Sequence, residues 1–231
     1  MKLLLYGEAH RPGSGAWCYA ETLRALGHEV LPFDDWTALQ PYRKDFVARA
    51  YRRLVHGLWP AHQRAHASAL IEAVRTHRPD ICLILKGLFL GPEDVAALRA
   101  LGAWVVNVNH DDFFSHDFRN WTALQRRAIP GYDHIFTTRE VNVEEVRPRN
   151  ARVEFFPFAY YPRIHRPVPI PEAERGQWER DVVFVGTYEH HRSRLLEALA
   201  EAVPARYAIY GEFWHHVGRR SPLQRYLQNR E

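Results

Sequence analysis

The stretch that decides the fold reads Arg152-Val-Glu-Phe-Phe-Pro157-Phe-Ala-Tyr-Tyr-Pro162, and after a proline-rich passage it resumes with Asp181-Val-Val-Phe-Val-Gly186-Thr187. A short apolar strand is expected to stop at Pro157. Further prolines at 162, 167, 169 and 171 disfavour both a helix and a central strand. A second apolar strand then ends in Gly-Thr. This order predicts that one α/β domain closes here and that another begins.

The predicted boundaries are a domain over 1–162, a proline-rich linker over 163–180, and the beginning of a second domain over 181–231. Two α/β domains joined in this way make a cleft, and small ligands usually bind in such clefts. The second domain is expected to contain strands at 181–185 and 207–210 with a helix from about 192 to 202 between them. That is short for a doubly wound domain with its own core.

Outward from this joint, apolar strands alternate with helices through the first domain. Connections that contain a helix are too long to be hairpin turns, so neighbouring strands should run parallel. Strand, glycine-containing loop, helix and strand at the start of the chain are typical of a doubly wound sheet. Thr137 or Thr138 is expected to cap the last helix. The predicted strands are 3–6, 29–33, 81–85, 103–108, 134–136 and 153–156, and the predicted helices are 17–26, 46–58, 67–74, 92–101, 121–127 and 141–146.

Composition narrows the function classes. The chain of 231 residues is 46% hydrophobic and 25% charged, with a net charge of +4. Lysine and arginine are scattered without a basic stripe, so no nucleic-acid partner is predicted. The charge fits either a mildly basic site for a phosphorylated ligand or a solvated arginine-rich surface. Cys18 and Cys82 make neither a disulfide framework nor a metal spacing. No apolar run is long enough to span a membrane or to act as a signal peptide, which favours a cytoplasmic protein.

Ligands of open parallel sheets bind outside the carboxyl ends of the strands. In the first domain this rule selects Gly13, Gly15 and Lys86. The first loop lacks the third glycine of the dinucleotide fingerprint, so NAD binding is not favoured. In the second domain the rule selects Gly186 and Thr187.

Two groups of residues could carry chemistry. Gly186, Thr187 and Arg192 could bind a phosphate through backbone amides and a guanidinium group; the alternative is a tight turn beside a solvated arginine. His110, Asp111 and Asp112, followed by His116 and Asp117, could supply a general base, bind sugar hydroxyls or bind a divalent metal. The alternative for them is a capped turn that bonds local backbone amides.

His62 and His66 have a spacing that zinc sites use. No third ligand is visible, so we expect a solvated helix face.

Several of these segments occur in an order that resembles the CgeB-type spore-maturation proteins, which are glycosyltransferase-like proteins of the GT-B fold. The resemblance covers most of the chain from about residue 80 onward. The matching stretches are Lys86-Gly-Leu-Phe89, Asn109-His-Asp-Asp112, Tyr132-Asp-His-Ile-Phe-Thr-Thr138 with Asn142-Val143, Phe155-Phe-Pro-Phe158 with His165-Arg-Pro167, Asp181-Val-Val-Phe-Val-Gly186 with Arg192 and Leu195-Leu196, and Tyr210-Gly211 with Trp214.

The resemblance implies two Rossmann-like domains, with a nucleotide-sugar donor mainly on the second and the acceptor mainly on the first. It implies neither a bound metal nor a cofactor, because basic side chains and helix amides stabilise the leaving diphosphate. Gly186, Thr187 and Arg192 would take that role. Asp111, Asp112 or His110 would supply a base, by position, and Gly13, Gly15 and Lys86 would line the acceptor side.

The sequence departs from the family in one respect. In the family the second domain continues well beyond the point where this chain ends, and the later segment supplies the acidic residue that holds the donor ribose. We therefore expect an incomplete donor site and doubtful activity for this chain alone. The leading hypothesis is a glycosyltransferase that transfers a sugar to a glycan, protein or small-molecule acceptor. Its rival is a non-catalytic module that binds a glycan or a partner protein.

Overall fold

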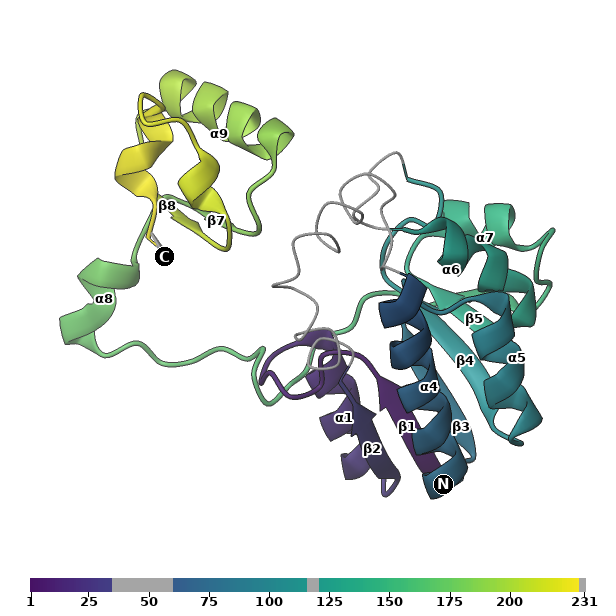
Figure 1. The fold of residues 1–231 in the computed structure, drawn as a ribbon. Coiled ribbons are helices and arrows are strands. Elements are labelled where there is room, and N and C mark those ends of the chain that lie inside the picture. The colour runs from purple at the N-terminus through teal and green to yellow at the C-terminus, as the bar shows by residue number, and fades with distance from the viewer. Residues whose placement is uncertain (35–59, 116–120, 229–231) are drawn as a thin grey trace. The chain divides into compact units, whose positions relative to one another are not determined.

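The computed structural model describes residues 1–34, 60–115 and 121–228. Within the chain two compact units form, Met1–Arg166 and Pro167–Glu231, here called unit 1 and unit 2 (Figure 1). The helix predicted at 46–58, together with His116 and Asp117, lies outside the described residues. In the parts of the chain that are described, no helix is both long enough and apolar enough to cross a membrane.

Unit 1 is built on a parallel sheet of six strands in the order β2-β1-β3-β4-β5-β6. The parallel sheet predicted from the alternation of strands and helices is confirmed. Consecutive strands β3 to β6 are neighbours, so the loops that follow them lie along one edge of the sheet. The strands are β1 (Lys2–Tyr6), β2 (Glu29–Phe33), β3 (Ile81–Leu85), β4 (Trp104–Asn109), β5 (His134–Thr137) and β6 (Val153–Phe155).

The helices of unit 1 cover the two faces of this sheet unequally. The larger apolar cluster joins strand residues such as Leu4 and Ile84 to residues of α4, α5, α6 and α7. A smaller cluster on the opposite face joins Leu5 and Val30 to α1. Leu4 and Leu5 belong to different clusters because successive side chains of a strand point to opposite faces. The helices are α1 (Gly15–Ala25), α4 (Pro60–His77), α5 (Pro92–Ala100), α6 (Ala123–Ala128) and α7 (Glu140–Val146), with a 3-10 turn η2 (Ile129–Gly131) after α6 (Figure 1).

Capping explains where several of these helices begin. The Ser14 hydroxyl accepts a hydrogen bond from the Trp17 amide and caps α1. The Asp94 carboxylate accepts from the Gly91 amide at the start of α5. For α7 the predicted threonine cap is wrong. Arg139 holds the cap position without a side-chain bond, and the Thr138 hydroxyl instead donates to the carbonyl of His110, because β4 and β5 end side by side.

Unit 2 is a smaller α/β body. Strands β7 (Val182–Val185) and β8 (Tyr207–Tyr210) pair in parallel and are connected by α9 (His190–Ala202). Two 3-10 turns follow, η3 (Trp214–His216) and η4 (Pro222–Tyr226), and both contribute to the apolar cluster beneath α9. Alternate residues of β7 are not covered, since Val183 is 52% and Val185 75% exposed.

A helix forms inside the segment expected to be a linker. Helix α8 (Glu172–Trp178) begins after Pro171, with Glu172 and Glu174 in its first turn, where carboxylates favour a helix start. None of its residues is buried. Its last residue, Trp178, stacks on Tyr210 of β8 with ring centroids 6.5 Å apart, so the helix contacts the strand pair without burying a residue.

Candidate functional site

Two predicted site residues from different strands meet at the carboxyl edge of the unit 1 sheet. Lys86 follows β3 directly, and Asp111 lies two residues beyond the end of β4. Because β3 and β4 are paired neighbours, the Lys86 Nζ atom reaches the Asp111 Oδ2 atom at 2.6 Å. Both side chains are about one-third exposed, so the pair is open to solvent and to a ligand.

The backbone at Lys86 is held in an unusual conformation. Lys86 has a φ of 62°, and Gly87, which follows it, has a φ of 71°. A side chain at Gly87 would press on Ile84, so only glycine fits this second position. The carbonyl of Lys86 accepts hydrogen bonds from the Asn107 Nδ2 atom at 3.3 Å and from the Gln125 Nε2 atom at 2.7 Å. Both amide side chains are fully buried. They fix the turn that aims Lys86 at Asp111.

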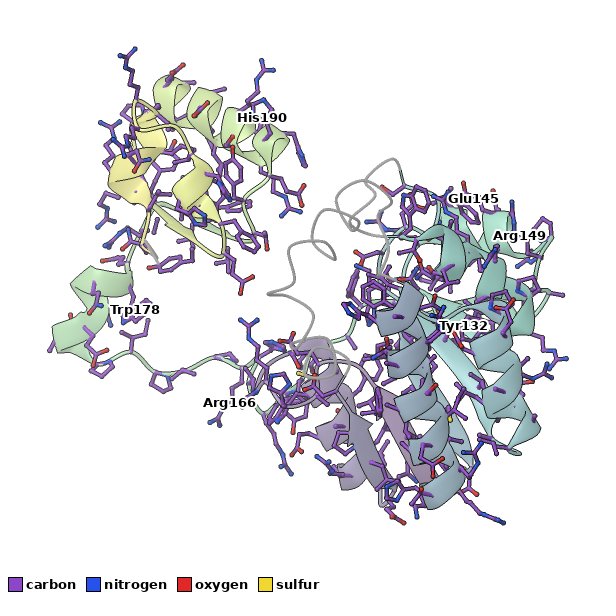
Figure 2. The ribbon with its side chains drawn as sticks, in the orientation of Figure 1. Tyr132, Glu145, Arg149, Arg166, Trp178 and His190 are labelled. Atoms are coloured by element: carbon purple, nitrogen blue, oxygen red, sulfur yellow. The ribbon has the colours of Figure 1, made fainter. Side chains whose placement is uncertain are left out.

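Sequence reasoning missed Asn107 and Gln125. The signal that could have found Asn107 is a polar residue inside the apolar strand Trp104–Asn109, since a buried polar side chain needs a partner. No local pattern pointed to Gln125, because its partner lies 39 residues away. Beneath the same turn, Tyr132 is buried within unit 1, and burial raises the pKa of its phenol (Figure 2).

His110 lies beside this pair and packs between two rings. Its ring centroid is 5.8 Å from that of Tyr19 on α1 and 5.2 Å from that of Phe158, which follows β6. Burial lowers the pKa of His110 below its ordinary value, and the nearby Asp111 carboxylate opposes the shift only in part. The buried Nδ1 atom has no hydrogen-bond partner among the described residues. The lowered pKa favours the neutral form of the imidazole, which is the form that can accept a proton.

Asp112 is engaged in the turn itself. Its Oδ1 atom accepts hydrogen bonds from the Phe114 amide at 2.8 Å and from the Asn142 Nδ2 atom at 2.8 Å. Asn142 is fully buried, and its Oδ1 atom accepts from the Phe113 amide at 3.2 Å. These hydrogen bonds show that Asp112 stabilises the turn, as in the alternative prediction of a capped turn that bonds local backbone amides. His110 and Asp111 are left as the reactive candidates of the group.

Gly13 and Gly15 belong to the loop that leads from β1 into α1. Gly15 is the first residue of α1, and Ser14 between the two glycines caps the helix and donates from its hydroxyl to the Glu8 carbonyl at 2.6 Å. The same helix carries Tyr19, which contacts the ring of His110. Helix α1 therefore extends from the glycine loop to His110 at the carboxyl edge of the unit 1 sheet.

In unit 2 the predicted phosphate-binding residues lie together, but Arg192 has local partners. Its Nη1 atom donates to the Thr187 carbonyl at 3.0 Å, and its Nη2 atom lies 3.3 Å from the Glu189 Oε1 atom. Glu189 also faces His191 at 3.4 Å. A phosphate at this position would compete with the Glu189 carboxylate for the Arg192 guanidinium group.

Gly186 is fixed by backbone geometry at the carboxyl edge of β7. Its amide donates to the Tyr210 carbonyl at 2.9 Å, and its carbonyl accepts from the buried Trp214 indole at 2.8 Å. Gly211, with a φ of 136°, lies so close that a Cβ atom there would overlap the Gly186 carbonyl oxygen. The loops after β7 and β8 are consequently locked together.

The prediction of a solvated helix face at His62 and His66 is wrong for His66. Only 2% of His66 is exposed, and its Nε2 atom lies 2.8 Å from the Tyr6 hydroxyl. Its ring also contacts Phe33. The periodicity of α4 places His66 toward the sheet, where burial lowers its pKa to about 4. Among the residues the structure describes, no three His, Cys, Asp or Glu side chains gather as a metal site.

Comparisons with known proteins show the fold of the chain. No family model matches the chain, and no curated protein matches its sequence. A solved structure of S. aureus MnaA with UDP matches with a TM-score of 0.53 at 8% identity, over 90% of this chain and 60% of that one. An OtsA apo structure matches with a TM-score of 0.55 at 13% identity, over 90% and 64%.

A third match is the structure titled trehalose-6-phosphate from E. coli bound with UDP-2-fluoro glucose, with a TM-score of 0.51 at 13% identity and coverage of 90% and 64%. The chain thus spans 60–64% of the length of these structures. At such low identity the likeness shows the fold alone. The fold is a parallel-sheet α/β fold that matches GT-B glycosyltransferase folds, as predicted from the sequence.

Proposed function

We propose that this chain belongs to a glycosyltransferase of the GT-B type, close to the CgeB-like proteins, which transfers a sugar from a nucleotide-sugar donor to an acceptor hydroxyl. One observation carries the proposal. Lys86, His110 and Asp111, which come from the ends of adjacent strands, meet at the carboxyl edge of a six-stranded parallel sheet, where such folds bind ligands. Two of the three matched structures contain UDP or UDP-2-fluoro glucose, and all three share the fold, which supports the same proposal.

The proposed chemistry at this edge is proton removal from the acceptor. Neutral His110 accepts the hydroxyl proton as the acceptor oxygen forms its bond to the anomeric carbon. The bond between that carbon and the diphosphate oxygen breaks, and the diphosphate leaves with the electron pair. Asp111, held by Lys86, accepts a hydrogen bond from another acceptor hydroxyl and orients it. The Asp111 carboxylate also stabilises the imidazolium that forms.

The donor side of the proposal falls on unit 2. Gly186 has no side chain to block a diphosphate from approaching the backbone of Thr187, and Arg192 offers a guanidinium group that must release Glu189 when a phosphate binds. The exchange replaces one charge-assisted contact by another, so the gain from Arg192 is modest.

The test is a calorimetric titration of the full chain with UDP, GDP, ADP and dTDP and with their glucose conjugates. Saturable binding with a preference among these ligands supports the proposal. A folded chain that binds none of them contradicts it. In a transfer assay with a bound donor, His110→Gln is expected to lower kcat by about 10²- to 10⁴-fold, the usual contribution of a general base.

The rival function, a non-catalytic module that binds a partner, is favoured by the uncovered residues of β7. Val183 and Val185 form an exposed apolar pair on a strand, and such surfaces often mark contact sites. The same titration separates the two functions, because a partner-binding module has no need to discriminate among nucleotides.

A further inference from the structure

Four aromatic rings gather on the loops that follow β7 and β8 in unit 2. We call Tyr188, Phe213, His215 and His216 the ring cluster. The Phe213 and His216 rings are stacked with centroids 6.4 Å apart and planes at 27°. The ring centroid of His216 lies 4.1 Å from that of His215 and 6.0 Å from that of Tyr188. The cluster therefore forms one continuous aromatic surface at the carboxyl edge of the β7–β8 pair.

The ring cluster stands on a rigid base. The Tyr188 amide donates to the Glu212 carbonyl at 2.9 Å, which joins the two loops next to the Gly186–Gly211 contact. Trp214, only 1% exposed, packs edge-on against Tyr188 with centroids 5.4 Å apart. Its indole bond to the Gly186 carbonyl fixes the loop from below. The aromatic surface is thus positioned before any ligand arrives.

Phe213 is the member that packing does not explain. Its φ of 65° lies in the left-handed region, which a bulky side chain adopts only at a cost. Despite that cost, 51% of the residue is exposed, so the strained backbone presents the ring to solvent instead of burying it. Strained residues of this kind are concentrated where a ligand is bound. Glycine would fit this backbone better than phenylalanine, so we infer that the aromatic ring itself has a role.

The surroundings of the ring cluster favour an anionic ligand with a planar part. His215 and His216 are exposed members of the cluster, and His190 begins α9 two residues after Tyr188 (Figure 2). Arg219 and Arg220 follow in exposed positions. An aromatic surface with imidazole N–H donors, followed in sequence by two arginines, suits a base joined to a diphosphate.

We propose that the exposed face of Phe213, backed by His216, stacks on the heterocyclic base of a nucleoside diphosphate. This inference rests on the proposed function, in which unit 2 binds the donor, and it adds a base-binding residue that lies outside the Gly186, Thr187 and Arg192 group. Stacking uses the π-face that every base has, so the contribution of Phe213 is similar for different bases. The diphosphate part of the ligand does not touch this ring.

The experiment compares Phe213→Gly and Phe213→Trp with the parent chain by calorimetry, using UDP, ADP and inorganic pyrophosphate. Phe213→Gly removes the ring and relieves the positive φ, so its fold is not at risk. We expect it to weaken UDP and ADP binding by about 5- to 100-fold, the range of one stacking contact. Pyrophosphate affinity should stay within about twofold, and Phe213→Trp should bind both nucleotides at least as tightly as the parent.

The outcomes separate this inference from the proposed function. If the parent binds UDP or ADP and Phe213→Gly binds it equally well, the base-stacking inference is overturned while the donor role of unit 2 stands. If pyrophosphate binding falls in parallel with nucleotide binding, Phe213 acts on the loop and the inference is overturned as well. If the parent binds no nucleotide, both proposals fall together.

Discussion

The Nζ atom of Lys86 lies 2.6 Å from the Oδ2 atom of Asp111. The two residues are 25 positions apart in the sequence, and different roles are predicted for them from the sequence alone. Lys86 was expected on the acceptor side, and Asp111 among the candidate bases. Their contact depends on the parallel register of β3 and β4 and on the left-handed turn at Lys86. The ion pair makes Asp111 a positioned carboxylate.

Substituting Lys86 separates the strain of its backbone from the charge of its side chain. Lys86→Met and Lys86→Gly both remove the Nζ atom, at a cost of up to about 1 kcal/mol for a partly exposed pair. Glycine also relieves the positive φ, so Lys86→Gly should be more stable than Lys86→Met by about 1 kcal/mol. Urea denaturation measures the difference. A Gly variant less stable than the Met variant would show that the turn is not strained.

Asp111 and Asp112 should respond differently to the same change. Asp112→Asn keeps an acceptor oxygen for the Phe114 amide and the Asn142 side chain, so it should cost less than about 1 kcal/mol, whereas Asp112→Ala should cost about 1–3 kcal/mol. Asp111→Asn should leave stability within about 1 kcal/mol of the parent, yet lower the transfer rate by at least about tenfold. Equal losses of activity in the two Asn variants would contradict this division of roles.

Gly211→Ala should disrupt unit 2 while leaving unit 1 folded. The new Cβ atom would overlap the Gly186 carbonyl oxygen, and the φ of 136° is strained for alanine, so a loss of at least about 3 kcal/mol is expected. Gly218→Ala is the matched control, since a Cβ there meets no atom and its φ is not positive. Limited proteolysis followed by mass spectrometry would locate the cleavage sites. Protection of unit 2 in Gly211→Ala would refute the close approach.

His66 should make the stability of unit 1 depend on pH. Burial lowers its pKa from 6.5 to about 4, so the unfolded chain takes up the proton first as the pH falls. Stability from this group is complete above pH 6.5 and is lost between pH 6.5 and 4, by up to about 3 kcal/mol. His66→Gln removes the titration, and denaturation at several pH values should give it a flatter profile across this window. Parallel profiles for parent and variant would exclude His66 as the cause.

The sequence predicted the described elements of unit 1 well because residues within or next to each element determine where it begins and ends. The continuous apolar run Ile81–Leu85 is a strand with the predicted bounds, and Pro92 begins α5 as expected. Pro157 lies two residues beyond the end of β6. The errors are of another kind. His66 and Thr138 have partners in distant elements, Tyr6 and His110, and spacing along the chain cannot show which face of a helix or strand end meets them.

What the sequence by itself determined is the order of strands and helices, the parallel sheet, and the loops in which ligand-binding residues would lie. These follow from apolar periodicity, proline and glycine, which act through neighbours in the chain. Only the tertiary structure decided that Lys86 meets Asp111, that Asp112 is engaged by Asn142, and that Phe213 presents its ring beside His216. Those relationships depend on strand register and loop contact, because pairing between strands brings together residues whose separation in sequence carries no signal of their separation in space.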